Sequence, residues 1–285
     1  MKFIIIPKSL KDLDLYKNKG ADTFIFGLRN YAVNYPNLTL EKIKEISPHT
    51  NLFIAVNKNI FNQDLADLRK VLKELAKLPI LGVLFYDLGV INIVLEEKID
   101  LNLVWHNTHQ VTNYKTINYL KEKGIKGAYL TNEITLEDRL KIANETDLEL
   151  MTLVLGHPVI SHSKRSLLTN YFNALGKKKS KDTYLIKERT GDYIVTEKDN
   201  ETSIYDKRII NGVGALFSLK EKIAYGVIDT TFISNDICLE VLDIFNLINK
   251  GEIKEIEAIN KVNNLVGDYS GFFYQKTIYK VKKDE

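Results

Sequence analysis

The chain is poor in cysteine: Cys238 is the only one among 285 residues. One thiol cannot form a disulfide within the chain, and it cannot supply the ligands of an all-cysteine metal or iron–sulfur site. The sequence also lacks any run close to the ~20 apolar residues that a membrane-spanning helix needs. Its first residues, MKFIIIPKSL, hold an apolar run too short for a signal peptide. We therefore expect a cytoplasmic protein.

Several catalytic signatures are absent as well. The sequence has no GxSxG elbow, no HExxH motif and no glycine-rich phosphate loop after its first apolar run. Cys238 lies in DICLEVL, on the apolar face of a predicted helix, and is expected to be a core residue rather than a nucleophile. The net charge of +3 permits contact with RNA but does not by itself argue for it.

Short apolar runs alternate with longer amphipathic ones along most of the chain. Runs that are apolar throughout are typical of parallel strands buried on both faces. We expect strands at 3–6, 23–26, 52–56, 82–85, 101–105, 127–130, 148–155 and 224–233. We expect helices at 10–19, 40–46, 63–77, 88–97, 114–123, 136–144, 236–249 and 253–263. The predicted helix caps are Ser9, Thr39, Asn62, Asp87 and Thr135.

This alternation is typical of a barrel or of a doubly wound α/β sheet. Its regular spacing, with no phosphate loop, favours an α/β fold of the (β/α)8 TIM-type barrel class. We expect one barrel domain over residues 1–285, interrupted by an insertion at about 177–206. Alternating residues around Thr190, Gly191 and Asp192 predict a β-hairpin there, with a third strand near 203–205.

In a barrel of this class, working residues follow the carboxyl ends of the strands. That rule selects polar residues and one glycine in the predicted loops. They are Asn57, Asp87, His106, Asn107, His109, Thr131, Glu133, Gly156, His157, His162, Arg165 and Asn235. Asp87 is better explained as a helix cap, and Asn57 and Thr131 are also explained by bonds to loop backbone. As substrate-binding residues we select Asn57, Asn107, His109, Glu133 and Gly156.

The catalytic candidates are Arg165, His157 and His162. Arg165 can offer its planar guanidinium to a carboxylate or phosphate, or it can hold its loop through a salt bridge to an acid such as Glu133. The paired histidines, His106 with His109 and His157 with His162, match no standard zinc spacing. We therefore predict no metal site, and expect loop histidines bonded to backbone.

A basic run, Lys177–Lys181, precedes the predicted hairpin. Together with Tyr184, Arg189 and Tyr193 it forms a basic and aromatic patch. Such a patch is either solvated surface or a contact for an RNA backbone.

The ordered set of segments resembles the collagenase-like peptidase family U32, which is of unknown catalytic type. GADTFIFG at 20–27 is similar to the family's GADAVYLG, and SKRSLLTNY at 163–171 is similar to SGRCLLSNY. SGFFY at 270–274 resembles the TGFYF ending, and LFIAVNKNIFNQDLADL at 52–68 resembles a family strand, turn and helix. The resemblance covers nearly the whole chain and implies a barrel.

The resemblance also implies an iron–sulfur cluster, which better-understood members hold on four cysteines. Here Val159 and Ser166 stand at the first two of those positions, and the KKKSKDTYL region has no cysteine. Arg165 and Gly156 match the family motif, whereas Leu155 replaces its histidine. We therefore expect this chain to hold no cofactor of that kind.

Several family members resemble proteins for tRNA, ribosomal RNA or quinone hydroxylation. The short form without cluster cysteines is similar to the shorter of two paired proteins for tRNA wobble-uridine 5-hydroxylation. That resemblance implies a longer, cluster-bearing relative as partner, tRNA as a further partner, and a small carboxylate such as prephenate as hydroxyl donor. The alternatives are a collagenase-like peptidase and a non-catalytic interaction partner. Whether the chain is itself an enzyme stays open, with tRNA modification favoured over proteolysis.

Overall fold

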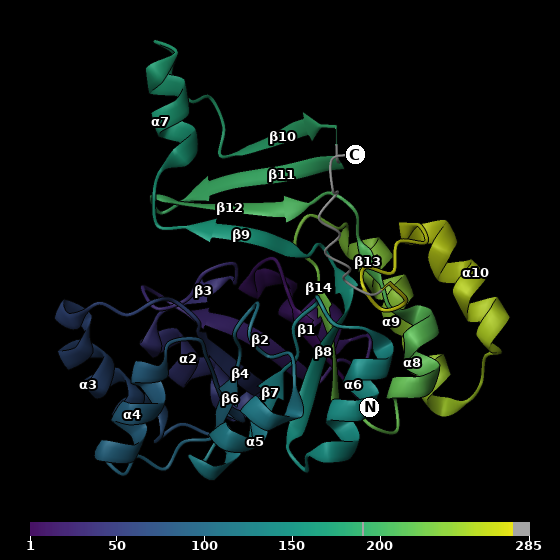
Figure 1. Cartoon of the computed structure of the whole chain (residues 1–285), viewed down its shortest axis with the longest axis horizontal. Helices are drawn as coiled ribbons and strands as arrows, with labels where there is room; N and C mark the ends of the chain where they lie inside the picture. The colour runs from purple at the N-terminus through teal and green to yellow at the C-terminus, as the bar shows by residue number, and fades with distance from the viewer. Residues whose placement is uncertain (190, 276–285) are drawn as a thin grey trace, which may run out of the picture.

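Parallel strands close into a barrel in the computed structural model, which describes residues 1–189 and 191–275 (Figure 1). The ring closes because β1 pairs with β14 on one side and with β2 on the other. In ring order the strands are β1 Lys2–Ile6, β2 Thr23–Leu28, β4 Asn51–Val56, β5 Gly82–Phe85, β6 Leu103–Trp105, β7 Gly127–Tyr129, β8 Glu149–Gly156 and β14 Tyr225–Asp229. An open doubly wound sheet would leave two free edges, so closure confirms the (β/α)8 barrel.

The apolar runs of the sequence become strands because both of their faces are covered. Ile4 and Ile5 of β1 point to opposite faces, and neither is exposed. Phe24 and Ile25 of β2 are buried in the same way. One face of each strand fills the barrel interior and the other packs against the surrounding helices.

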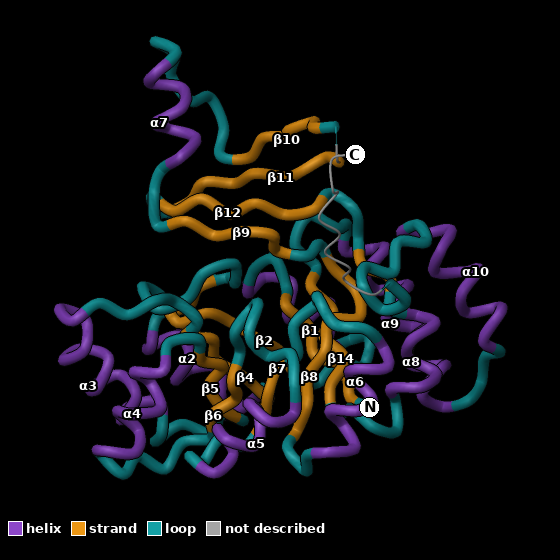
Figure 2. The backbone as a smooth tube through the Cα atoms, viewed as in Figure 1, coloured by secondary structure: helices purple, strands orange, loops and turns teal. Residues whose placement is uncertain are grey.

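Helices surround the barrel as the amphipathic runs predict (Figure 2). They are α1 Leu13–Lys17, α2 Leu40–Ile46, α3 Leu65–Leu75, α4 Leu88–Glu96, α5 Tyr114–Glu122, α6 Leu136–Glu145, α8 Val213–Leu219, α9 Asn235–Lys250 and α10 Glu255–Val266. Thr39, Asp87 and Thr135 accept hydrogen bonds at the starts of their helices, which confirms them as caps. The cap predicted at Asn62 is wrong, because a 3₁₀ turn at Asn62–Asp64 precedes α3.

A second, antiparallel sheet stands over the carboxyl ends of the barrel strands (Figure 1). Its order is β10-β11-β12-β9, and we call it the appended sheet. Its strands are β9 Val159–Ser163, β10 Thr183–Glu188, β11 Gly191–Lys198 and β12 Glu201–Asp206. Between β9 and β10 lies α7, Leu167–Ala174, which projects away from the barrel in the view of Figure 1.

The predicted hairpin insertion is confirmed by β10 and β11, which pair antiparallel, and the third strand by β12. Thr190, in the predicted turn, lies outside the described residues. Asp199 and Asn200 turn the chain between β11 and β12 with φ of 53° and 63°, the conformation that two-residue hairpin turns require. The sheet also includes β9, which precedes the predicted insertion.

Other short elements were not predicted. β3, Asn37–Leu38, extends the barrel sheet beside β2, and β13, Ile210–Asn211, pairs antiparallel with β8. The helix α8 was missed too. The predicted strand at 224–233 is wrong at its end, because β14 stops at Asp229.

The SGFFY segment at 270–274 packs the carboxyl-terminal part of the described chain against the barrel. Phe273 is 3% exposed, and its carbonyl accepts a hydrogen bond from Leu136 N at 2.8 Å. Its ring centroid lies 4.5 Å from the guanidinium of buried Arg139. Arg139 also donates to Thr152 Oγ1 of β8. The segment therefore acts as part of the core. No helix within residues 1–189 and 191–275 is long and apolar enough to cross a membrane.

Candidate functional site

Aromatic and ionisable side chains gather where the barrel strands end. We call Tyr35, His106, Tyr129, Tyr205 and Asp229 the mouth cluster. Tyr129 and Asp229 are the last residues of β7 and β14, and His106 directly follows β6. Tyr35 lies in the loop after β2. The parallel barrel brings these positions to one end because all its strands point the same way.

Three rings of the mouth cluster, those of Tyr35, His106 and Tyr129, are packed against one another. The His106 and Tyr129 rings stack with centroids 4.5 Å apart and planes 17° apart. Tyr35 approaches the same histidine edge-on, and its hydroxyl lies 3.5 Å from His106 Nδ1. These contacts fix the imidazole between two phenol rings.

The appended sheet covers the mouth cluster through β12. Tyr205, 3% exposed, donates from its hydroxyl to Asn34 Oδ1 at 3.0 Å, and Ser203 Oγ donates to the same oxygen at 2.6 Å. Asn34 has a φ of 62°, a conformation that asparagine adopts more readily than most residues. The loop after β2 is thus bonded both to the barrel and to the sheet above it.

Burial sets the charge states in the mouth cluster. Burial raises the pKa of Asp229 to about 6, although the backbone N–H of Thr231 donates to this carboxylate at 3.0 Å. Burial lowers the pKa of His106 to about 4, so the imidazole is neutral at pH 7. Burial also raises the pKa of Tyr129 and Tyr205, and the charge of Asp229 adds to this effect. Asp229 therefore titrates near neutral pH and can accept or donate a proton, as a general acid–base group must.

Gly156 lies beside Asp229. It ends β8 with a φ of +151°, and a Cβ at this position would stand 2.9 Å from Asp229 Cβ and 3.2 Å from its carbonyl oxygen. Real Cβ atoms do not approach this closely. Glycine is needed here, and the motif residue Gly156 is brought to the mouth cluster.

Asn57 and Asn107 hold loops around the cluster. Asn57 Oδ1 accepts from Val33 N at 3.0 Å, and Asn57 Nδ2 donates to the Val33 carbonyl at 3.2 Å. This fixes the loop that carries Tyr35. Asn107, 5% exposed, accepts from His109 N at 3.3 Å. Both asparagines therefore support the site through backbone bonds.

Other predicted positions have structural partners. Asp87 accepts from Gly89 N at 2.8 Å and from Ile60 N at 2.9 Å, as a helix cap and loop brace. Thr131 Oγ1 donates to the Thr108 carbonyl at 2.6 Å. Asn235 Nδ2 donates to Asp12 Oδ1 at 2.9 Å.

The predicted histidines do not share one partner. His109 forms a half-exposed pair with Glu133, with 3.0 Å between Nδ1 and Oε1. His157 is buried and its Nδ1 donates to the Asp206 carbonyl at 3.0 Å. His162 Nδ1 lies 2.9 Å from Ser203 Oγ. In the described part of the chain, no three His, Cys, Asp or Glu side chains are placed to hold a metal ion.

Arg165 lies away from the mouth cluster. It is exposed in the connection between β9 and α7, and its backbone carbonyl accepts from Thr202 Oγ1 at 2.8 Å. Glu133, the acid considered for its salt bridge, instead pairs with His109. The structure thus separates Arg165 from Gly156, although both match the same family motif.

The residues around α7 do not fit an iron–sulfur cluster. Val159 begins β9 and has no donor atom in its side chain. Ser166 precedes α7, and its hydroxyl lies 3.5 Å from Asn200 Oδ1. The only thiol of the chain, Cys238, is buried in α9. Clusters of this kind need several thiolates, so the residues present do not form their ligand set.

Sequence reasoning missed four of the five members of the mouth cluster. Tyr129 lay inside a predicted strand, and Asp229 was hidden because the predicted strand ran past it to residue 233. Tyr35 and Tyr205 follow no motif. A test for titratable residues within one position of each strand end would have found Tyr129, and a correct end for β14 would have found Asp229.

These features define a parallel (β/α)8 barrel in which an appended antiparallel sheet covers the carboxyl ends of the strands. The model of peptidase family U32 matches residues 8–220. The chain belongs to peptidase family U32.

Similar proteins carry names from RNA modification. The tRNA hydroxylation protein P2 of Bacillus subtilis (strain 168) is 27% identical, over 98% of this chain and 99% of that protein. The tRNA hydroxylation protein P of Escherichia coli (strain K12) is 24% identical, over 54% of this chain and 34% of that protein. The solved structure of the U32 peptidase Mk0906 is 18% identical, with a TM-score of 0.46, and the match covers 55% of this chain and 69% of that one.

Proposed function

We propose that the chain is a component of tRNA wobble-uridine hydroxylation, working in the cytoplasm with a longer, cluster-bearing relative. The observation that carries this proposal is the full-length similarity to tRNA hydroxylation protein P2. The mouth cluster supports it, because stacked aromatic rings beside a proton-exchanging carboxyl suit a nucleobase. In this role Asp229 moves a proton, while Tyr35 and His106 orient the base.

The chain itself holds no iron–sulfur cluster in this scheme, because the cysteines are missing. The family resemblance implies prephenate or a similar small carboxylate as hydroxyl donor. Asp229 would repel a carboxylate in the mouth cluster. We therefore place the donor and the cluster on the longer relative, and keep the base contacts here.

One arrangement favours the alternative, a peptidase. Ser203 Oγ, His162 and Glu201 lie in the order of a hydrolytic triad, with 2.9 Å from Oγ to His162 Nδ1 and 3.5 Å from His162 Nε2 to Glu201 Oε2. Ser203, however, is 5% exposed and donates its proton to Asn34. His162 Nδ1 must then donate to Oγ, whereas a general base has to accept. These residues therefore fasten β12 to the barrel.

The test is the nucleoside composition of tRNA from a strain in which the gene is deleted, measured by mass spectrometry. We expect wobble 5-hydroxyuridine to fall and uridine to rise in proportion. Unchanged 5-hydroxyuridine would contradict the proposal. Purified protein should leave casein intact, and cleavage that Ser203→Ala abolishes would establish the peptidase instead.

A further inference from the structure

Positive charge is concentrated in one part of the chain. Residues 164–189 hold eight Lys and Arg against two Asp and Glu, whereas the whole chain has a net charge of only +3. The rest of the chain is therefore net negative. The charge lies in the connections on either side of α7 and along β10, outside the barrel (Figure 1).

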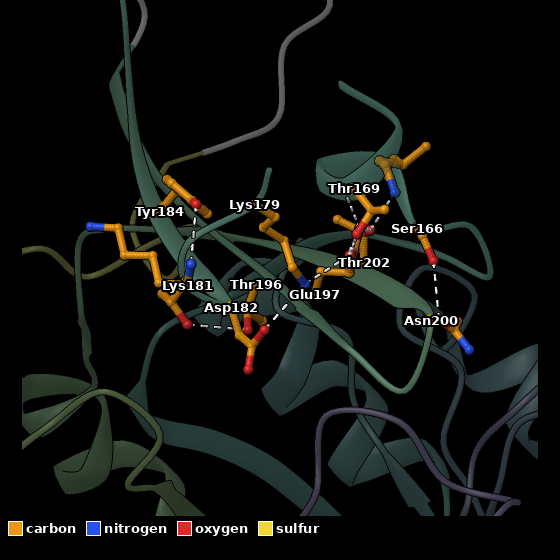
Figure 3. A network of polar contacts seen from close by, with 12 residues as sticks. Ser166, Thr169, Lys179, Lys181, Asp182, Tyr184, Thr196, Glu197, Asn200 and Thr202 are labelled. Carbon is orange, nitrogen blue, oxygen red and sulfur yellow. Dashed lines mark hydrogen bonds and ion pairs between the residues drawn. The ribbon is translucent and has the colours of Figure 1, made fainter. Parts of the chain in front are cut away.

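A buried glutamate organises this region. Glu197 of β11 is 3% exposed and accepts from Lys179 Nζ at 2.9 Å and from Thr169 N at 3.0 Å (Figure 3). It also accepts from the Thr169 hydroxyl in the first turn of α7. Through these bonds one carboxylate holds both α7 and the lysine run against the appended sheet. The ammonium group of Lys179 is therefore already paired with this carboxylate, and it is not available to bind a ligand.

Tyr184, which is half-buried, also takes part in this network. Its hydroxyl accepts from Ser180 N at 3.1 Å and from Lys181 N at 3.3 Å, which braces the lysine run (Figure 3). Its ring packs on Phe172, with centroids 5.0 Å apart. Tyr184 and Lys179 therefore shape the loop, and they are not the outward-facing members of the patch that the sequence suggested.

The outward side carries a different set. We call Tyr171, Lys177, Lys178 and Lys181 the basic face. The three lysines are exposed, and Tyr171 on α7 is 59% exposed. Among the ion pairs found within residues 1–189 and 191–275, the lysine partner near this face is Lys179, and none involves Lys177, Lys178 or Lys181. Lys181 lies 5.2 Å over the Tyr184 ring. The Tyr171 ring packs on Phe172 with centroids 5.5 Å apart, and Phe172 packs on Tyr184, so ring contacts connect the exposed tyrosine to the lysine run.

We propose that the basic face binds the phosphate backbone of structured RNA, with tRNA as the ligand. The inference rests on the proposed function and adds where the RNA is held. Unpaired lysines complement phosphates, and an exposed tyrosine can stack on a base. The cores of protein–protein interfaces are, by contrast, depleted in lysine. The exposed amides of Asn170 and Asn173 on α7 offer further hydrogen bonds to a sugar–phosphate backbone.

The test is fluorescence anisotropy with a labelled tRNA transcript that has uridine at the wobble position. The full chain is compared with the variant Lys177→Ala/Lys178→Ala/Lys181→Ala. We expect at least about tenfold weaker binding, and a dependence of log affinity on log salt that is shallower by about three. Tyr171→Ala should weaken binding about tenfold at every salt concentration, because stacking is not screened.

The matched control is Lys11→Ala/Lys126→Ala/Lys222→Ala, which removes the same charge at exposed lysines elsewhere. It should bind tRNA nearly as the wild type does. Equal losses in both triple variants, or no salt-dependent binding by the wild type, would overturn the proposal. Wild-type tRNA binding by the basic-face variant, together with loss of its association with the longer relative, would assign the face to a protein partner. If the basic face binds tRNA but deletion leaves 5-hydroxyuridine unchanged, the proposed function fails and the binding site stands.

Discussion

At the scale of single residues, the mouth cluster shows how a barrel sets the chemistry of its loops. Asp229 is the last residue of a strand whose preceding residues are buried. Its carboxylate therefore lies in poorly solvated surroundings, which disfavour the charged form. Gly156 permits that position because it has no side chain. The sequence alone singles out Gly156 as a motif residue, but it does not single out Asp229 or show that the two are neighbours. The two residues come into contact because the ends of β8 and β14 lie side by side in the barrel.

The first prediction concerns Asp229. Its pKa is raised in the folded chain, so the group favours folding below pH 4 and loses this contribution as pH rises through about 6. Asp229→Asn should therefore stabilise the chain by about 2 kcal/mol at pH 8 and have no such effect at pH 4. Urea unfolding at both pH values measures this. Equal destabilisation at both would show that Asp229 is structural and not poised for proton exchange.

The second prediction concerns Gly156. Gly156→Ala places a Cβ against Asp229 at an unfavourable φ, and should cost about 3 kcal/mol in the free energy of unfolding. Gly20→Ala is the control, because Gly20 also has a positive φ, +83°, but a Cβ there would meet no atom within 4 Å. The control should cost about 1 kcal/mol. Thermal unfolding compares the two, and equal costs would show that the approach of Asp229 imposes no constraint.

At the scale of elements, buried apolar runs and caps made most of the fold predictable. The helix Leu40–Ile46 and the strand Gly82–Phe85 were predicted with the observed ends. Thr39 marks the start of that helix, and both faces of that strand are buried. β9 was missed because its sequence, VISHS, is as polar as a loop. This segment forms a strand by pairing with β12, which is distant in the sequence. Glu197 was missed for the same reason, since its partners come from two other elements.

The third prediction concerns this glutamate. Burial alone would raise its pKa, but hydrogen bonds from Thr169 and Lys179 outweigh burial and hold the pKa at about 2. Its contribution to stability is therefore present above about pH 4.5 and is lost as pH falls toward 2. Glu197→Gln should lower the free energy of unfolding by about 3 kcal/mol at pH 7, and the difference should shrink at pH 3.

Exposed Glu188 on β10 supplies the control for that experiment. Glu188→Gln should change stability by less than about 0.5 kcal/mol at either pH. Protection of β11 amides from hydrogen exchange should fall in Glu197→Gln, while the barrel strands stay protected. A uniform loss of protection across the barrel would mean that the appended sheet and the barrel unfold as one unit.

At the scale of the whole molecule, a barrel carries the mouth cluster, and an appended sheet covers that cluster and carries the basic face. Ser203 and Tyr205 fasten that sheet to Asn34 above the mouth cluster. The sequence predicted the barrel from repetition, but not how the sheet sits on it, because that depends on single hydrogen bonds between remote segments. Val159 and Ser166 stand where the family resemblance implies cysteine ligands, and the chain has the barrel fold without them.

The proposed function gives this chain a role in tRNA hydroxylation that depends on the mouth cluster. The most direct measurement is the wobble 5-hydroxyuridine content of tRNA in a deletion strain that carries wild-type or Asp229→Asn protein at equal abundance. We predict that the wild type restores the modification and that Asp229→Asn, although more stable at neutral pH, does not. Full restoration by Asp229→Asn would contradict a role for the mouth cluster, and no loss of 5-hydroxyuridine on deletion would contradict the proposed function.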